Sequence, residues 1–335
     1  MTARDLQRLP KAHLHLHFTG SMRVGTLIDL ARERGRRLPS SLTDDVALQV
    51  EPTARGWFRF QRQYDTARAV VDSESAMRRI LREAAEDDAA EGSGRLELQV
   101  DPTSYAPFVG GLTSALEIVL DEAQRSEEAT GVSIGIVVAA SRTRHPLDAR
   151  TLARLAARAG DRVVGFGLSN DERRGDTAAF APAFRIAREA GLASVPHGGE
   201  LLGPDHITAV MDSLAPDRLG HGVRSAEDPA LLERIREAGI ALEVCPASNA
   251  ALGVYADPTD VPLLRLIEAG VPIALAADDP LLFGSRLLDQ YETARALGVD
   301  DDGLADLAAD SIRASRAPAE VTSRLLAGVE EWRRS

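Results

Sequence analysis

Histidines and carboxylates gather at four points of the chain where a short apolar run ends. These run ends are His15-Leu16-His17, Pro196-His197-Gly198-Gly199-Glu200, Gly220-His221-Gly222 and Asp278-Asp279-Pro280. Side chains two residues apart on a strand point to the same side, so His15 and His17 would share one face. Imidazole and carboxylate groups are the ligands that zinc and related divalent metals prefer. Since stability alone gives no reason to repeat this pattern four times, the residues indicate a metal-dependent site.

Eight apolar runs must position these residues. They are Ala12–Phe18, Leu96–Val100, Ser133–Ala139, Val163–Leu168, Ala193–His197, Arg218–His221, Ala241–Cys245 and Ile273–Ala277. From the second run onward they start roughly every 20 to 40 residues, the spacing of βα units, and most are nearly continuous in apolar residues, as in a buried parallel sheet. We therefore predict an α/β fold, a (β/α)8 TIM barrel formed by residues 1–335 as a single domain. Such barrels keep their active sites at the carboxyl ends of the strands, where the four run ends would meet.

Helical patterns fill the intervals between the runs. They cover Ser73–Glu91, Ala178–Ala190, Pro229–Ala238 and Val261–Ala269, and the last three lead into an Ala-Gly pair, a helix stop signal. The long interval Thr19–Arg95 must hold extra helices between the first and second strands. It includes the aromatic stretch Trp57–Tyr64, which fits either the core of a helix or a lid over an apolar pocket.

Composition narrows the classes of partner and compartment. The chain has 39 basic and 51 acidic residues, a net charge of −12, so a polyanion would be repelled and we expect no nucleic-acid partner. No apolar stretch approaches the roughly 18 residues of a membrane helix, and the N-terminus lacks a signal peptide's apolar core. Cys245 is the only cysteine, so no intrachain disulfide can form, and we expect a cytoplasmic protein.

The basic residues also limit the chemistry. Lys11 is the only lysine, and it lies at the start of the first strand. A lysine Schiff base and a two-metal site bridged by a carboxylated lysine from a later strand are therefore disfavoured. The small zinc deaminases that use a Cys-x-x-Cys pair are excluded, because the chain has one cysteine.

Six short stretches resemble the adenosine deaminase family of the amidohydrolase superfamily. They are PKAHLHLHFTGS, GFGLSNDE, PHGGE, RLGHG, LEVCPASN and ALAADDP, and they occur in the family's order and at its spacing from residue 10 to about residue 285. The resemblance implies zinc-dependent hydrolytic deamination of an adenine-type purine. Adenosine or 2′-deoxyadenosine would be converted to inosine or its deoxy form and ammonia, and the partner would be this small purine.

Position by position, the resemblance implies a role for each polar residue at the mouth. His15, His17 and His197 would be the imidazole ligands, and Asp278 the carboxylate ligand, of one Zn²⁺ per chain. Glu200, three residues past His197, would protonate the purine ring nitrogen beside the amino-bearing carbon. Burial raises the pKa of a carboxyl group, which would keep this acid protonated.

The two remaining polar residues would act on water and purine. His221 resembles the residue that orients and deprotonates the attacking water, whose pKa a divalent cation lowers from about 15.7 to about 7. Asp279 resembles the carboxylate that bonds the imidazole part of the purine. Among pocket residues, His17 would also contact the substrate, and the resemblance favours a lid that carries Phe58 and Phe60.

Two departures from the family pattern bear on the substrate. Two residues past the second histidine the family commonly has an acid that meets the ribose 5′-hydroxyl, and here that position is Thr19. In the fourth-strand motif a glycine, whose N–H meets purine N3, is replaced by Asn170. Adenine, or an adenosine modified at C5′ such as aminodeoxyfutalosine or methylthioadenosine, is therefore the alternative substrate.

Other interpretations remain open. Asp278-Asp279 could form a turn or a helix N-cap before Pro280, and adjacent strand residues would need a bend to share one site. His13 fits a core or supporting histidine better than a further ligand, and Ser248 and Asn249 could simply close a turn. Two further functions are less favoured by the sequence: another reaction of a mononuclear amidohydrolase, and metal binding by a barrel that has no catalytic activity.

Overall fold

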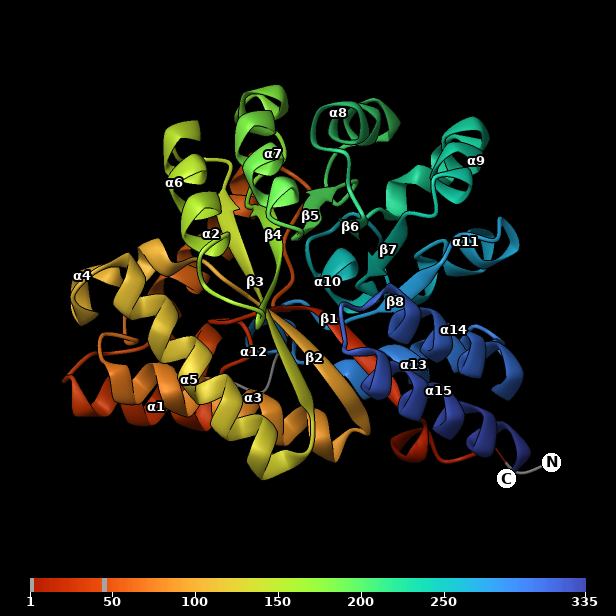
Figure 1. The fold of residues 1–335 in the computed structure, drawn as a ribbon, viewed down its shortest axis with the longest axis horizontal. Coiled ribbons are helices and arrows are strands. Elements are labelled where there is room, and N and C mark those ends of the chain that lie inside the picture. The colour runs from red at the N-terminus through yellow and green to blue at the C-terminus, as the bar shows by residue number, and fades with distance from the viewer. Residues whose placement is uncertain (1–2, 44–46) are drawn as a thin grey trace.

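The computed structural model describes residues 3–43 and 47–335, and at its centre lies a parallel sheet of eight strands in the order β1 to β8 (Figure 1). The strands are β1 (Lys11–His17), β2 (Ser93–Val100), β3 (Ser133–Ser141), β4 (Val163–Ser169), β5 (Ala193–Gly198), β6 (Arg218–His221), β7 (Ala241–Val244) and β8 (Ile273–Leu275). Every neighbouring pair in this order is parallel. Each predicted apolar run overlaps one of these strands, so the predicted α/β barrel is confirmed.

The sheet closes where β1 meets the segment that follows β8. His17 N donates to Asp278 O at 3.0 Å, and Asp278 N donates to His15 O at 3.0 Å. This parallel bridge joins the last strand to the first at the carboxyl ends of the strands. Most strand residues are buried, because side chains fill the interior of the barrel while helices cover its outside.

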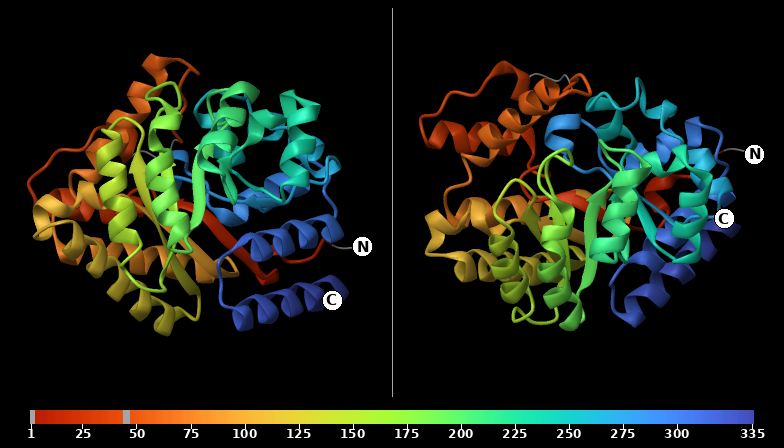
Figure 2. Two further views of the ribbon diagram at one scale, coloured as in Figure 1. Left: turned by 45° about the horizontal axis from the view of Figure 1, so that its top comes forward. Right: turned by 90° about the horizontal axis from the view of Figure 1, so that it is seen from above.

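Helices alternate with the strands and surround the barrel (Figures 1 and 2). They are α1 (Val24–Glu33), α2 (Ala54–Arg68), α3 (Glu74–Ala90), α4 (Ala106–Val109), α5 (Leu112–Thr130), α6 (Pro146–Ala156), α7 (Ala181–Glu189), α8 (Pro204–Leu214), α9 (Pro229–Glu237), α10 (Pro246–Ala251), α11 (Leu263–Glu268), α12 (Pro280–Phe283), α13 (Leu287–Ala296), α14 (Asp301–Ala314) and α15 (Ala319–Arg334). Short 3-10 helices cover Leu6–Arg8, Ser40–Leu42, Pro102–Ser104, Thr177–Phe180, Val223–Glu227 and Pro258–Asp260.

The four predicted helices are present, with ends set by local chemistry. α3 begins after Ser73, whose side chain accepts a hydrogen bond from Ala76 N. The helix predicted over 178–190 is divided into a 3-10 turn and α7, which has Pro182 in its first turn. α11 begins later than predicted because Pro262 is its N-cap, and proline is tolerated only at a helix start.

The interval between β1 and β2 holds α1, α2 and α3, as the length of that interval predicted. α14 packs against β1 and β8 and supports the closure of the barrel. The two ends of the chain meet beside it, where Trp332 Nε1 donates to Asp5 O at 2.8 Å (Figure 2). Within the described residues no helix is long and apolar enough to cross a membrane.

Candidate active site

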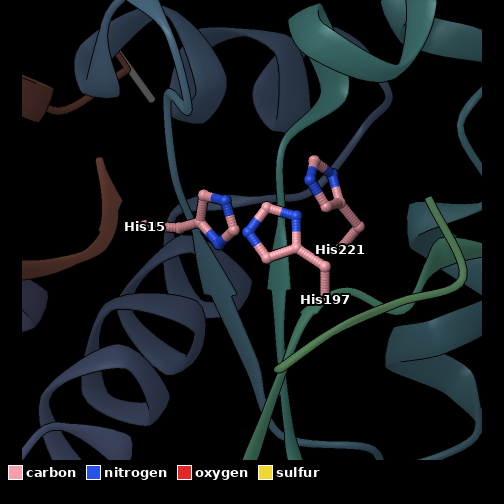
Figure 3. A group of neighbouring side chains, drawn as sticks. All are labelled: His15, His197 and His221. Carbon is pink, nitrogen blue, oxygen red and sulfur yellow. The ribbon is translucent and has the colours of Figure 1, made fainter. Parts of the chain in front are cut away.

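The polar run ends converge at the carboxyl ends of the strands. His15 and His17 end β1, His197 lies in β5, His221 ends β6, and Asp278 follows β8. Nε2 of His15 and Nε2 of His17 lie 3.4 and 3.2 Å from Asp278 Oδ1. The ring centroids of His15 and His197 are 4.6 Å apart, and Figure 3 shows both rings beside that of His221. The predicted convergence of four strands on one site is present.

Bends in the backbone aim two of these side chains inward. His221 and Asp278 have φ values of 64° and 63°, in the left-handed region that side chains other than glycine rarely adopt. Such strain costs about 1–3 kcal/mol per residue and is typical of functional sites. The bend at Asp278 is the one that lets Asp278 and Asp279 share a site. The Asp279 carboxylate can lie against Gly20 only because glycine has no side chain, since a Cβ there would overlap that carboxylate.

The buried imidazoles have ring nitrogens that no other described residue satisfies. Both ring nitrogens of His197, and Nε2 of His15 and of His221, lack a hydrogen-bond partner. Ligand atoms of His15, His17 and Asp278 lie within 4.8 Å of one another, as do those of His15, His197 and His221. Burying such atoms without a partner costs about 1–3 kcal/mol each, which a bound cation would offset. The residues therefore fit a divalent metal.

The charges of the metal-site residues are strongly perturbed. Burial alone would lower the pKa of His15, but the adjacent carboxylates of Asp278 and Glu243 outweigh it and raise this pKa to about 10. A cation that binds Nε2 would therefore displace a proton from it. Burial lowers the pKa of His197 well below its usual range, and the neighbouring imidazoles add to this effect. Burial alone would raise the pKa of Asp278, yet the adjacent imidazoles of His15 and His17 hold it well below its usual range. Asp278 is therefore a carboxylate anion, as a metal ligand must be.

The two other acids at the site, Glu200 and Asp279, have raised pKa values, in contrast to Asp278. Burial raises the pKa of Glu200 well above its usual range, and the nearby charge of Glu172 adds to this rise. Burial also raises the pKa of Asp279, and the charge of Asp278 adds to it. One oxygen of Glu200 and one of Asp279 have no hydrogen-bond partner among the described residues. Both acids therefore favour the protonated form and have free positions for a ligand.

His221 lies between the acid and the metal-site carboxylate. Its Nε2 is 3.8 Å from Glu200 Oε1 and 4.0 Å from Asp278 Oδ2. Burial lowers the pKa of His221 to about 4. Its imidazole is thus neutral near pH 7 and has an unpaired nitrogen that can accept a proton.

Several supporting residues were not predicted from the sequence. Glu243 Oε2 lies 2.8 Å from His15 Nδ1, and Ser248 Oγ donates to Asp278 Oδ2 at 2.6 Å. Asn249 Nδ2 lies 3.4 Å from Nδ1 of His221. The interpretation that Ser248 and Asn249 only close a turn is therefore wrong, because both side chains contact the site from α10. The acid in an otherwise apolar run, LEV, was the available signal for Glu243.

Glu172 supports the loop that carries the acid. Its carboxylate accepts backbone hydrogen bonds from Glu200, Leu201 and Leu202 at 3.1, 2.8 and 2.8 Å. The last residue of the GFGLSNDE stretch thus fixes the position of Glu200. His13 has a similar structural role, since its Nδ1 lies 2.9 Å from Asp88 Oδ1 and its Nε2 accepts from Ala277 N.

A cavity of about 570 Å³ opens from these residues to the surface. His17, His197, Glu200, Asp278 and Asp279 line its inner end. One wall is α2, which contributes these cavity-lining residues: Ala54, Trp57, Phe58, Phe60, Gln61, Tyr64, Asp65 and Arg68.

The aromatic stretch combines the two roles considered for it. Phe60 is buried and stacks on Phe283 with ring centroids 5.6 Å apart, as a helix core residue does. Phe58 is 64 % exposed and lies at the cavity. α2 therefore packs through one side and borders the cavity through another.

Thr19 and Asn170 differ in how they meet the cavity. Thr19 is fully buried, is not part of the cavity wall, and has its hydroxyl 2.6 Å from the hydroxyl of Tyr105, which does line the cavity. The contact of Thr19 with the substrate therefore stays a prediction, and in this structure Thr19 meets the cavity wall through Tyr105. Asn170 lines the cavity with φ of 81°, so asparagine retains the backbone conformation that glycine favours.

A barrel with an imidazole and carboxylate cluster at the carboxyl ends of its strands is the architecture of the amidohydrolase superfamily. The family described as adenosine deaminase matches residues 10–332. The chain belongs to the adenosine deaminase family and is a deaminase enzyme.

Three known proteins illustrate the range within this family. The chain is 59 % identical to a putative adenosine/adenine deaminase of Streptomyces coelicolor, over 98 % of each chain. It is 32 % identical to an aminodeoxyfutalosine deaminase of Acidothermus cellulolyticus, over 90 % of this chain and 87 % of the other. The crystal structure of adenine deaminase from Arthrobacter aurescens superposes with a TM-score of 0.89 at 28 % identity, covering 98 % of this chain and 100 % of the other.

Proposed function

We propose that this enzyme hydrolytically deaminates an adenine-type purine nucleoside, adenosine or 2′-deoxyadenosine, to the corresponding inosine and ammonia. One Zn²⁺ per chain would be held by His15, His17, His197 and Asp278. The observation that carries the proposal is Glu200, a buried carboxyl with an unpaired oxygen that lines the same cavity as the unpaired imidazole of His197.

Orphaned donor atoms support the metal assignment. Three imidazoles and one anionic carboxylate are a donor set that zinc prefers, and the unpaired nitrogens of His15 and His197 have no hydrogen-bond partner among residues 3–43 and 47–335. When bound, the divalent cation would lower the pKa of water from about 15.7 to about 7, which makes hydroxide available at neutral pH.

The remaining polar groups divide the proton transfers between them. Water oxygen bonds to the amino-bearing carbon while Glu200 gives its proton to the adjacent ring nitrogen, which prevents negative charge from building up there. His221, neutral and within 4 Å of Glu200, is placed to hold the water and take its proton. The proton that His221 took from the water would then pass to the amino group, and the carbon–nitrogen bond would break to release ammonia. The added hydroxyl would give its proton back to Glu200 and become the carbonyl, which restores the acid. Asp279 is placed to hold the five-membered ring.

Adenine and C5′-modified adenosines are the second candidate substrates. A protein named adenine deaminase shares the fold of this chain, and one named aminodeoxyfutalosine deaminase is 32 % identical over 90 % of this chain. The Thr19 hydroxyl lies 2.6 Å from that of Tyr105, which lines the cavity, so both residues are candidates for selection at the ribose 5′ end.

A substrate panel tests the proposed function. Adenine, adenosine, 2′-deoxyadenosine and C5′-modified adenosines would be followed by loss of absorbance and release of ammonia. We expect the enzyme to release ammonia from at least one adenine nucleoside, and we expect the Glu200→Gln variant to lose this activity. A correctly folded, metal-loaded enzyme that releases no ammonia from any of these compounds would instead support another amidohydrolase reaction or a barrel that only binds metal.

We also propose a domain organisation and a cellular compartment for this enzyme. Because β1 and α14 lie at opposite ends of the sequence and pack together, we propose that residues 1–335 form one domain. A single buried cysteine, Cys245, suits a reducing compartment, so we place the enzyme in the cytoplasm.

A further inference from the structure

The outer part of the cavity is lined by four arginines. Arg68 comes from α2, Arg144 follows β3, and Arg173 and Arg174 follow β4. Arg144 and Arg174 are exposed, whereas Glu200 and Asp279 at the inner end are 3 and 2 % exposed. Asp65, Asp101 and Asp171 line the same cavity, so the four guanidinium groups there outnumber three carboxylates, although the whole chain carries a net charge of −12.

Arg173 and Arg174 retain hydrogen-bonding capacity after their contacts within the protein are formed. Arg173 Nε donates to Asp171 Oδ1 at 2.7 Å, but its Nη2 is buried without a partner among the described residues. Arg174 forms no ion pair within 4.0 Å with any residue in the described ranges. A guanidinium group left in this state can bind an anion at little cost in existing contacts.

Arg68 and Arg144 approach the same part of the cavity from two different elements. Both charges lower the pKa of Asp101, against a larger rise from burial. Arg68 already pairs with Asp65 and donates to Ser104 Oγ at 3.2 Å. Arg144 uses only Nε, which donates to Asp148 Oδ2 at 3.1 Å, so its terminal nitrogens are left for another partner. Ser141 and Thr143, whose hydroxyls lie 2.9 Å apart, add neutral donors on the same wall.

We propose that this rim is a subsite for an anionic group, a phosphate or a carboxylate, carried by the substrate at the end remote from its purine ring. The inference rests on the proposed function, because Glu200 and Asp279 would hold the purine at the inner end and direct the C5′ substituent outward. A neutral 5′-hydroxyl would leave most of these guanidinium donors unused. Arginine is the side chain best suited to hold phosphate or carboxylate through paired hydrogen bonds.

Matched substrates with neutral and anionic 5′ groups test the subsite. The enzyme would be assayed with adenosine, 5′-deoxyadenosine, adenosine 5′-monophosphate and adenosine-5′-carboxylic acid. We expect kcat/KM for at least one anionic substrate to exceed that for both neutral ones by about tenfold or more. The phosphate and carboxylate arms identify which anion the rim prefers. High salt should reduce this advantage and leave adenosine nearly unchanged, because exposed charges are screened.

Arginine variants locate the effect. Arg144→Gln combined with Arg174→Gln should lower kcat/KM for the preferred anionic substrate by about 10- to 100-fold, and for adenosine by less than about threefold. Arg125→Gln on α5 is the matched control, since Arg125 is exposed, pairs with Asp121 and lies outside the cavity. Equal losses for neutral and anionic substrates in the double variant would overturn the proposal.

Binding of products separates failure of this inference from failure of the proposed function. Calorimetry with inosine and inosine 5′-monophosphate needs no turnover, and we expect the monophosphate or the corresponding 5′-carboxylate to bind at least about tenfold more tightly. If adenosine is deaminated but neither anion is favoured in turnover or binding, the subsite is wrong and the deaminase function stands. If no adenine compound is deaminated, the proposed function is wrong, and the binding ratio alone decides whether the rim holds an anion.

Discussion

The Glu243 carboxylate lies 2.8 Å from Nδ1 of His15, and both side chains are completely buried. Arg218 joins Glu243 to Glu97 through two hydrogen bonds of 2.6 Å each. Glu97 in turn accepts from the backbone of Arg316, between α14 and α15. A chain of alternating charges therefore connects the site to the opposite end of the barrel. The contact of Glu243 with Nδ1 of His15 orients the ring and leaves its Nε2 for a metal.

Glu243→Gln should weaken metal binding. An amide cannot hold the His15 ring as firmly as a carboxylate, and loss of such a supporting contact typically costs about 10- to 100-fold in metal affinity. Competition with a chelator measures this affinity directly. Glu233→Gln on the exposed face of α9 is the control and should bind metal normally. An unchanged affinity in Glu243→Gln would show that the barrel holds His15 without this contact.

The purified protein should contain one divalent metal per chain, and zinc is the expected ion. The imidazole nitrogens without partners predict that removing the metal lowers the melting temperature, because the buried polar atoms are then left unsatisfied. Elemental analysis and thermal unfolding before and after chelation measure both effects. Two metals that are both needed for activity, or full activity without metal, would contradict the single-metal site.

Glu200→Gln should reduce turnover by about 10²- to 10⁴-fold or more. The amide keeps the shape of the side chain and cannot deliver a proton to the purine ring. Steady-state kinetics measure the loss, and an unchanged metal content shows that the site is intact. His221→Ala should also lose most activity, since a neutral imidazole is needed to accept the proton of the water. Turnover near normal in Glu200→Gln would remove this residue from the assigned role.

Asp279→Asn should impair recognition of the purine. Loss of a charged or proton-sharing hydrogen bond costs about 1.5–3 kcal/mol in kcat/KM. The Asp279 side chain forms no capping hydrogen bond to α12, so the melting temperature should change little. A large loss of stability with less than about a threefold change in kcat/KM (under 1 kcal/mol) would restore the helix-cap interpretation. Gly20→Ala should have a similar effect on kcat/KM, because the added Cβ displaces the Asp279 carboxylate.

Thr19→Val should lower stability and leave the choice of 5′ group nearly unchanged. The substitution removes the hydroxyl that lies 2.6 Å from Tyr105, and one such buried hydrogen bond contributes about 1 kcal/mol. Thermal unfolding measures the first effect, and the ratio of kcat/KM for adenosine and 5′-methylthioadenosine measures the second. A change of this ratio by more than about tenfold would show that position 19 determines 5′ selectivity through Tyr105.

The order of elements and most of the candidate site could be predicted from the sequence. Strands of a buried parallel sheet are continuous apolar runs, and parallel topology places every carboxyl end on one side, so polar run ends predict a shared site without knowledge of any distance. His15, His17, His197, Asp278 and Glu200 were predicted on this basis and on the resemblance, and the structure brings them together.

Contacts between side chains distant in sequence were decided only by the tertiary structure. His15 and Glu243 are 228 residues apart, and nothing local to either residue indicates the other. The resemblance predicted that Thr19 meets the ribose 5′ end, and only the tertiary structure shows that its hydroxyl lies beside that of Tyr105. Asn170 keeps a glycine-like backbone, and arginines from α2 and two loops meet at the rim. Local patterns determine which segments form strands and helices, whereas closure of the barrel and the choice of rotamers determine which side chains touch.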